Sequence, residues 1–220
     1  MTFIVYMHKK WPVGRLQSKS RASTTAQYWI TTFRALLMLF IGYFPAVSAA
    51  QTQTPDPAWH LLLGTGTSHI GWGATYERVE TLDIIFRREI PDQKTRGKGW
   101  YKNRRTVLME IPIHILTEPD EPPMFSLTFN SNWTFNLEGK IQPYVFAGGG
   151  GLYTEAQIPG TSSKIKGVYQ AGGGLRFNQG KMQFSLEARY HHVSNGGIEE
   201  PNDSLNSSKV LLGVRLPQRH

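Results

Sequence analysis

The chain of 220 residues contains no cysteine, so no disulfide framework can support its fold. It also lacks a hydrophobic run of the roughly 20 residues that a membrane-spanning helix needs, because its apolar stretch at residues 35–44 is shorter. No segment after it has the pattern of a long amphipathic helix. The absence of cysteine is compatible with an exported protein that needs no disulfide, and the absence of helical patterns directs attention to strands.

Acidic residues are absent from the first fifty positions, which hold six Lys and Arg residues. That segment therefore supplies six of the eight net positive charges of the chain, and the remainder carries only about +2. A charge this small gives no reason to expect nucleic acid as a partner.

Residues 1–50 have the features of a secretory signal with an extended leading region. A basic segment that ends at Arg34 precedes the apolar stretch, and Pro45 and the small residues 47–50 follow it. We expect cleavage after Ala49 or Ala50. A membrane anchor is the alternative, which the short apolar stretch disfavours. The predicted organisation is a signal over 1–50 and one domain over 51–220.

Eight segments of strand character, separated by turn-type residues, follow the signal. An even number of strands is typical of outer-membrane β-barrels, so the sequence predicts an all-β fold, an eight-stranded antiparallel transmembrane barrel. The predicted strands are 59–65, 78–88, 106–116, 124–135, 142–153, 166–177, 182–193 and 208–216.

Apolar and polar residues alternate in these segments. In 106–116, Val107 and Ile111 share one face, whereas Glu110 and His114 share the other. A charged face and an apolar face cannot both pack in a globular core, but a barrel with a polar lumen and a lipid-facing exterior accommodates both. A mean hydropathy of −0.34 keeps a soluble β-sandwich or a lipocalin-like periplasmic binder as alternatives.

The connections indicate the orientation of the barrel, since outer-membrane barrels pair short periplasmic turns with longer outer loops. Residues 137–140 and 178–181 read as short turns, and 155–163 and 195–207 read as long outer loops. Residues 91–105 are predicted to be a long, basic connection on the periplasmic side.

Residues 184–194 contain the most informative pattern. Phe184, Leu186, Ala188, Tyr190, His192 and Ser194 share the apolar face, because side chains two apart in a strand point the same way. His192 and Ser194 would then lie at the rim of the outer surface, where the imidazole can activate the hydroxyl. Counting back by two from Leu212 in the last predicted strand gives Asn206, which approaches His192 if the pairing of these strands continues beyond residue 208. A lipid ester is the substrate that such a position favours.

Metal and cofactor sites have no support in the sequence. His191 adjoins His192 but points to the opposite face, so the two cannot chelate one ion. The glycine runs 148–151 and 172–174 lack the lysine and hydroxyl residue of a phosphate-binding loop. We therefore expect no cofactor and no metal.

Residues 188–206, ARYHHVSNGGIEEPNDSLN, resemble the signature of the outer-membrane lipid A 3-O-deacylases of the PagL type, also called acyloxyacyl hydrolases. The resemblance is specific in the His-x-Ser-Asn-x-Gly motif with its following Pro-Asn, and it extends more weakly from residue 143 to the C-terminus. It implies an eight-stranded barrel in the bacterial outer membrane, lipid A or lipopolysaccharide as the membrane partner, and hydrolysis of the acyl ester at position 3. A lipid-exposed active site leaves a homodimer contact open.

By this resemblance Ser194 matches the family nucleophile, His192 its base and Asn202 a residue of the oxyanion hole. We expect backbone N–H groups near Gly196 and Gly197 to complete that hole.

One position departs from the family. Its third catalytic residue is a glutamate, and Asn206 stands there. An amide oxygen can accept the hydrogen bond from His192 and fix its tautomer, but it carries no charge to stabilise the imidazolium. Glu199, Glu200 and Asp203 are alternative carboxylates. A barrel with little or no catalytic activity and a structural or lipid-binding role is the competing interpretation.

Overall fold

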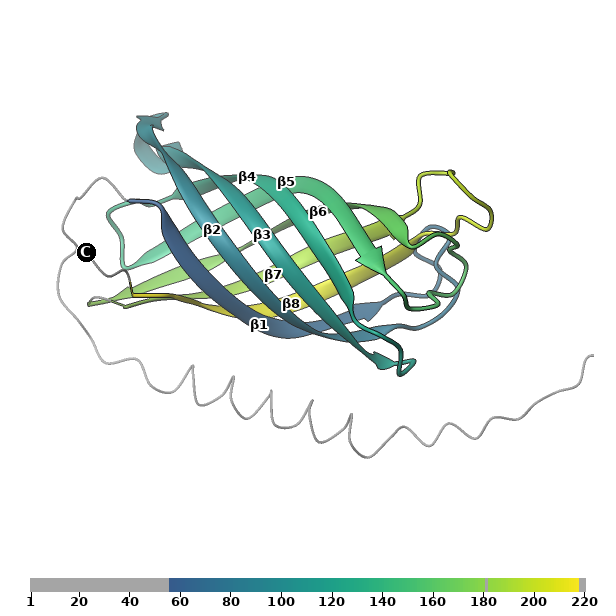
Figure 1. Ribbon diagram of the computed structural model, residues 1–220. Coiled ribbons are helices and arrows are strands. Elements are labelled where there is room, and N and C mark those ends of the chain that lie inside the picture. Colours follow the sequence, from purple (N-terminus) through teal and green to yellow (C-terminus); the bar gives the residue numbers. More distant parts are fainter. Residues whose placement is uncertain (1–55, 181, 218–220) are drawn as a thin grey trace, which may run out of the picture. The chain divides into compact units, whose positions relative to one another are not determined.

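The computed structural model describes residues 56–180 and 182–217, and the predicted signal lies outside them. Eight antiparallel strands form a closed barrel in which each strand pairs with its neighbours in sequence and β1 pairs with β8 (Figure 1). No helix in the described ranges is long and apolar enough to cross a membrane. The strands are β1 Ala58–Ser68, β2 Glu80–Arg96, β3 Asn103–Glu118, β4 Met124–Phe135, β5 Ile141–Thr154, β6 Ile165–Gln179, β7 Met182–Ser194 and β8 Leu205–Arg215.

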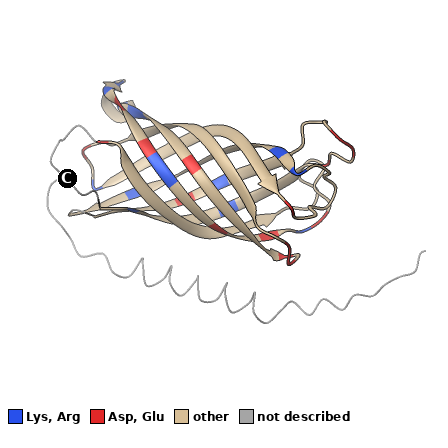
Figure 2. Ribbon diagram, in the orientation of Figure 1, with Lys and Arg blue, Asp and Glu red and all other residues tan. Residues whose placement is uncertain are grey.

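The two faces of the barrel wall differ as the alternation predicts. Ile111, Phe129 and Val145 face outward and are 43–52% exposed, whereas Glu110 and Arg189 point inward and are at most 3% exposed. Figure 2 shows charged residues along the strands as well as at both ends of the barrel. Because exposed apolar side chains are stable beside lipid, this wall fits a bilayer. The closed barrel also excludes the soluble sandwich.

The strand prediction is closest for β4, whose bounds are those expected, and most in error between β2 and β3. The sequence suggested a long connection over residues 91–105, but β2 continues to Arg96 and β3 begins at Asn103. A short 3-10 helix, Gly99–Tyr101, closes the hairpin. The basic residues there belong largely to strand ends, because ladder pairs such as Thr95 with Arg104 extend the sheet beyond the proline at position 91.

A network of charged side chains fills the middle of the lumen. Arg87 donates to Glu110 Oε1 at 2.7 Å and to Glu187 Oε2 at 2.6 Å. Arg189 donates to Glu110 Oε2 at 3.0 Å and also contacts Glu187. Two cations and two anions thus compensate one another where water is excluded, which is the condition under which buried charges are tolerated.

An apolar cluster closes the lumen at the outer end of the barrel. Inward residues of several strands meet Ala156 and Ile158, which come from the β5–β6 loop. The sequence predicts a polar lumen, and the structure shows instead that its outer mouth is apolar. This cluster separates the charged network from the outer solution. Its members are Val79, Leu116, Met124, Leu152, Ala156, Ile158, Val168, Val193 and Leu205.

Candidate active site

Ser194, His192 and Asn206 form a continuous chain of hydrogen bonds on the outer face of β7 and β8. The Ser194 hydroxyl lies 3.1 Å from His192 Nε2, and His192 Nδ1 lies 2.7 Å from Asn206 Oδ1. His192 and Asn206 are direct partners across the β7–β8 ladder, so the sheet register itself sets this spacing. The arrangement leaves Nε2 free to take the serine proton when Nδ1–H donates to the amide.

Two tyrosines hold the ring and the amide from the sides. The Tyr169 ring stacks on His192 with centroids 4.0 Å apart, and it comes from the paired position on β6. Tyr190, which lies on the outer face two residues before His192, donates its hydroxyl hydrogen to Asn206 Oδ1. The amide oxygen therefore accepts two hydrogen bonds, so its direction is defined by two independent groups.

The β7–β8 loop, residues 195–204, presents the groups expected to hold an oxyanion. Asn202 Oδ1 accepts the Asn195 N–H at 2.9 Å, which fixes the Asn202 side chain beside the end of β7 that carries Ser194. The Gly197 N–H already donates to Asn195 Oδ1 at 2.9 Å. Within the described residues, no hydrogen bond engages Asn202 Nδ2 or the Gly196 N–H, so these two donors are free.

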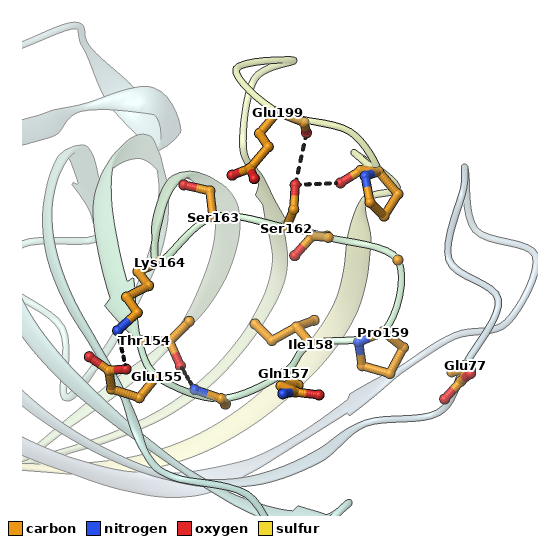
Figure 3. Close-up of a pocket in the computed structure, with 14 residues that line it drawn as sticks. Glu77, Thr154, Glu155, Gln157, Ile158, Pro159, Ser162, Ser163, Lys164 and Glu199 are labelled. Carbon is orange, nitrogen blue, oxygen red and sulfur yellow. Dashed lines mark hydrogen bonds and ion pairs between the residues drawn. The ribbon is translucent and has the colours of Figure 1, made fainter.

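The β5–β6 loop, residues 155–164, supports the β7–β8 loop (Figure 3). The Ser162 hydroxyl approaches the carbonyls of Glu199 and Pro201 at 3.0 and 3.1 Å. The buried Asn195 amide donates back to the Ser162 hydroxyl at 3.2 Å and to the Glu199 carbonyl at 2.5 Å. A hollow of about 900 Å³ opens between the two loops. In this region the Glu155 carboxyl bonds to Lys164, which lowers the pKa of Glu155 and raises that of Lys164.

The barrel surface beside Ser194 is open. Gly167 is the ladder partner of Ser194 on β6, and a Cβ there would meet nothing nearer than the Ser194 carbonyl oxygen at 3.7 Å. At Gly151, the partner of Gly167 on β5, a Cβ would have no neighbour within 4 Å. The Ser194 hydroxyl is therefore accessible from the side of β5 and β6.

None of the three loop carboxylates considered as substitutes hydrogen-bonds to His192. Glu199 and Glu200 are exposed, and the Asp203 backbone N–H donates to the Gly160 carbonyl at 2.7 Å. Asn206 is thus the residue that the structure places against His192 Nδ1.

A second serine–histidine pair lies in the lumen and was missed from the sequence. His114 Nδ1 bonds to Asp83, and His114 Nε2 lies 3.3 Å from the Ser126 hydroxyl. Lys209 Nζ is 2.8 Å from Asp83 Oδ1. All four side chains are at most 6% exposed. Only the inward direction of these side chains could be predicted from the sequence, and that direction alone does not show that residues of four strands converge.

Comparison with known proteins decides the family. The profile of the lipid A 3-O-deacylase (PagL) family matches residues 94–215, which is more than half of the chain and includes Ser194, His192, Asn202 and Asn206. The chain belongs to the PagL family. The resemblance inferred from residues 188–206 is therefore confirmed, and this member of the PagL family is an outer-membrane β-barrel.

Two solved structures are similar to this PagL-family barrel. The outer membrane enzyme PagL is 20% identical over 73% of this chain and 99% of its own, with a TM-score of 0.47. Neisserial surface protein A (NspA) is 10% identical over 77% of this chain and 99% of its own, with a TM-score of 0.53, and supports the eight-stranded fold. No curated protein sequence matches the chain.

Among residues 56–180 and 182–217, no group of three or more His, Asp or Glu side chains is arranged to hold a metal ion. The chemistry available at the site is that of a hydroxyl, an imidazole and amide groups.

Proposed function

We propose that the protein hydrolyses the ester-linked 3-O-acyl chain of lipid A in the outer leaflet, with Ser194 as nucleophile and His192 as base. The observation that carries this proposal is the hydrogen-bonded chain Ser194–His192–Asn206 on the outward-facing side of the wall, at the end of the barrel that carries the β5–β6 and β7–β8 loops. Membership of the lipid A 3-O-deacylase family supports the choice of substrate.

In the first step the Ser194 oxygen bonds to the ester carbonyl carbon while His192 Nε2 takes the hydroxyl proton. Asn206 keeps the other ring nitrogen protonated through its 2.7 Å contact, so Nε2 is the basic nitrogen. Negative charge moves to the carbonyl oxygen, where the free donors of Asn202 and Gly196 can stabilise it.

Collapse of this intermediate breaks the bond to the sugar oxygen, which takes the proton from His192. An acyl group remains on Ser194. Water then attacks the acyl carbon as His192 accepts its proton, and the return of that proton to Ser194 releases the fatty acid. No step needs a co-reactant other than water.

The experiment is release of fatty acid from lipid A by the folded protein in detergent, measured by mass spectrometry. We expect release by the wild type and by Ser126→Ala, whose hydroxyl lies in the lumen, and none by Ser194→Ala. If the wild type and Ser194→Ala release equally little, the hydrolase proposal fails.

The competing function is a lipid-binding or structural barrel without catalysis. The amide at position 206 favours it, since an amide cannot offset the positive charge of the imidazolium. Binding of lipid A without turnover by the wild type is the result that this alternative predicts in the same experiment.

A further inference from the structure

The β1–β2 loop, residues 69–79, covers Asn206 and meets the nitrogen end of its side chain. Asn206 Nδ2 lies 2.7 Å from the Trp72 carbonyl oxygen and 2.8 Å from the Ser204 hydroxyl. A carbonyl oxygen can only accept, so the group facing Trp72 must be a donor. The amide is therefore held with its NH₂ toward the loop and its oxygen toward His192.

Thr75 fixes the same amide with a hydroxyl whose bonding capacity is fully used. It donates to the Ser204 carbonyl at 2.8 Å and accepts from the Asn206 backbone N–H at 2.8 Å and from Nδ2 at 3.0 Å. One hydrogen and two lone pairs are all that a hydroxyl offers. Thr75 is 4% exposed, so water does not compete for these bonds.

The loop backbone is shaped for this close approach. Gly73 has φ +56°, and a Cβ there would lie 3.1 Å from Asn206 Nδ2. The start of the loop is anchored by His69, whose backbone N–H donates to the Asn206 carbonyl at 3.0 Å. The His69 ring also lies 2.7 Å from the Ser208 hydroxyl. Both anchors fix the loop to β8 directly beside the residue that it covers.

A carboxylate does not fit these surroundings. It would place an acceptor oxygen against the Trp72 carbonyl, where the amide places a donor. Two buried acceptors that face each other without a hydrogen between them are destabilising. The loop is thus complementary to the Asn206 amide and not to an aspartate carboxylate of the same length.

We propose that the β1–β2 loop positions the Asn206 amide for His192, and that Thr75 is a positioning residue of this site. The proposal deepens the hydrolase function and rests on it for its effect on rate. Its effect on the ring is independent of turnover: with the amide oxygen fixed, His192 carries its proton on Nδ1, and Nε2 is free to face Ser194.

The test compares Thr75→Val, which removes the hydroxyl at nearly constant shape, with Thr75→Ser, which keeps it. The tautomer of His192 is read from its ¹⁵N chemical shifts in detergent micelles, assigned with His192→Gln. We expect the Nδ1–H form in the wild type and in Thr75→Ser, and a mixture of forms in Thr75→Val. In acyl release, kcat should fall about tenfold in Thr75→Val with KM within about twofold, and Thr75→Ser should restore it.

An unchanged tautomer and rate in Thr75→Val would overturn the proposal. So would equal losses in Thr75→Val and Thr75→Ser, because the hydroxyl would then not be the group that matters. If the wild type releases no fatty acid but the tautomer changes as expected, the hydrolase function fails while the positioning role of the loop stands.

Discussion

The His192–Ser194 and His114–Ser126 pairs lie on opposite sides of the barrel wall, and each has a feature that the other lacks. In the lumen, His114 is bonded to the carboxylate of Asp83, but Lys209 occupies that carboxylate and the apolar cluster closes the mouth. On the outside, His192 has only the amide of Asn206, but the surface beside Ser194 is open.

The comparison shows that side-chain geometry alone does not define a hydrolytic site. Asp83 and Lys209 form a buried ion pair within the charge balance of the lumen, so a cation already neutralises the carboxylate beside His114. The open surface beside Ser194 distinguishes the outer pair. Family membership agrees with the role that we propose for Ser194.

The largest expected effect is the difference in acyl release between substitution of His192 and substitution of His114. His192→Ala should lower acyl release by about 10⁴-fold or more, since a nucleophile and its base act as a unit. His114→Ala should change the rate per folded protein by less than about threefold, because its ring touches only lumen groups. Mass spectrometry of released fatty acid checks both variants. A comparable loss in His114→Ala would contradict the distinction between the outer pair and the lumen pair.

The contribution of the charged network in the lumen is tested through the free energy of unfolding. Glu110→Gln removes one anion from the buried network with Arg87 and Arg189, and should lower the free energy of unfolding by about 3–5 kcal/mol. Its matched control is Glu138→Gln, which breaks an exposed pair with Lys102 and should cost less than about 1 kcal/mol. Urea titration in detergent measures both. Equal costs would show that the network carries no special share of the stability.

Carboxylate substitutions of Asn206 test whether a negative charge beside His192 raises turnover. If the missing charge limits the reaction, as the family motif suggests, Asn206→Glu should raise turnover. Because Trp72 and Thr75 are complementary to an amide, we expect Asn206→Glu and the isosteric Asn206→Asp to turn over about tenfold more slowly. Steady-state kcat for acyl release decides, and a higher kcat in either variant would contradict the structural account.

The smallest expected effect on kcat concerns Ser162, whose hydroxyl contacts the β7–β8 loop. Ser162→Ala removes contacts to the β7–β8 loop and should lower kcat about threefold, because Asn195 loses one of its partners. Ser163→Ala is the matched control, since that hydroxyl bonds to Ile165 of its own segment. Identical rates in the two variants would show that the Ser162 hydroxyl does not contribute to kcat.

The strands and their faces could be predicted because alternation repeats along each segment. Glu110 and His114 point inward as the pattern indicates, and counting by two along β7 and β8 places His192 opposite Asn206. The continuation of β2 to Arg96 and the start of β3 at Asn103 were not predicted, because Pro91 and the charged residues after it resemble a loop.

The surroundings of Asn206 could not be predicted in the same way. The Trp72 contact uses a backbone carbonyl, which no side-chain pattern encodes, and Thr75 is separated from Asn206 by 131 positions. Tyr190 is different, since it shares the outer face with His192 and its position was readable by parity. Its bond to Asn206 still required the structure.

The most direct test of the account is labelling of the folded protein in detergent with a serine-reactive phosphonate, followed by peptide mass spectrometry. A hydroxyl activated by its imidazole and open to the membrane should be modified, so we predict labelling at Ser194, its loss in His192→Ala, and no labelling at Ser126. Labelling at Ser126, or an unmodified Ser194 in protein that binds lipid A, would contradict the account.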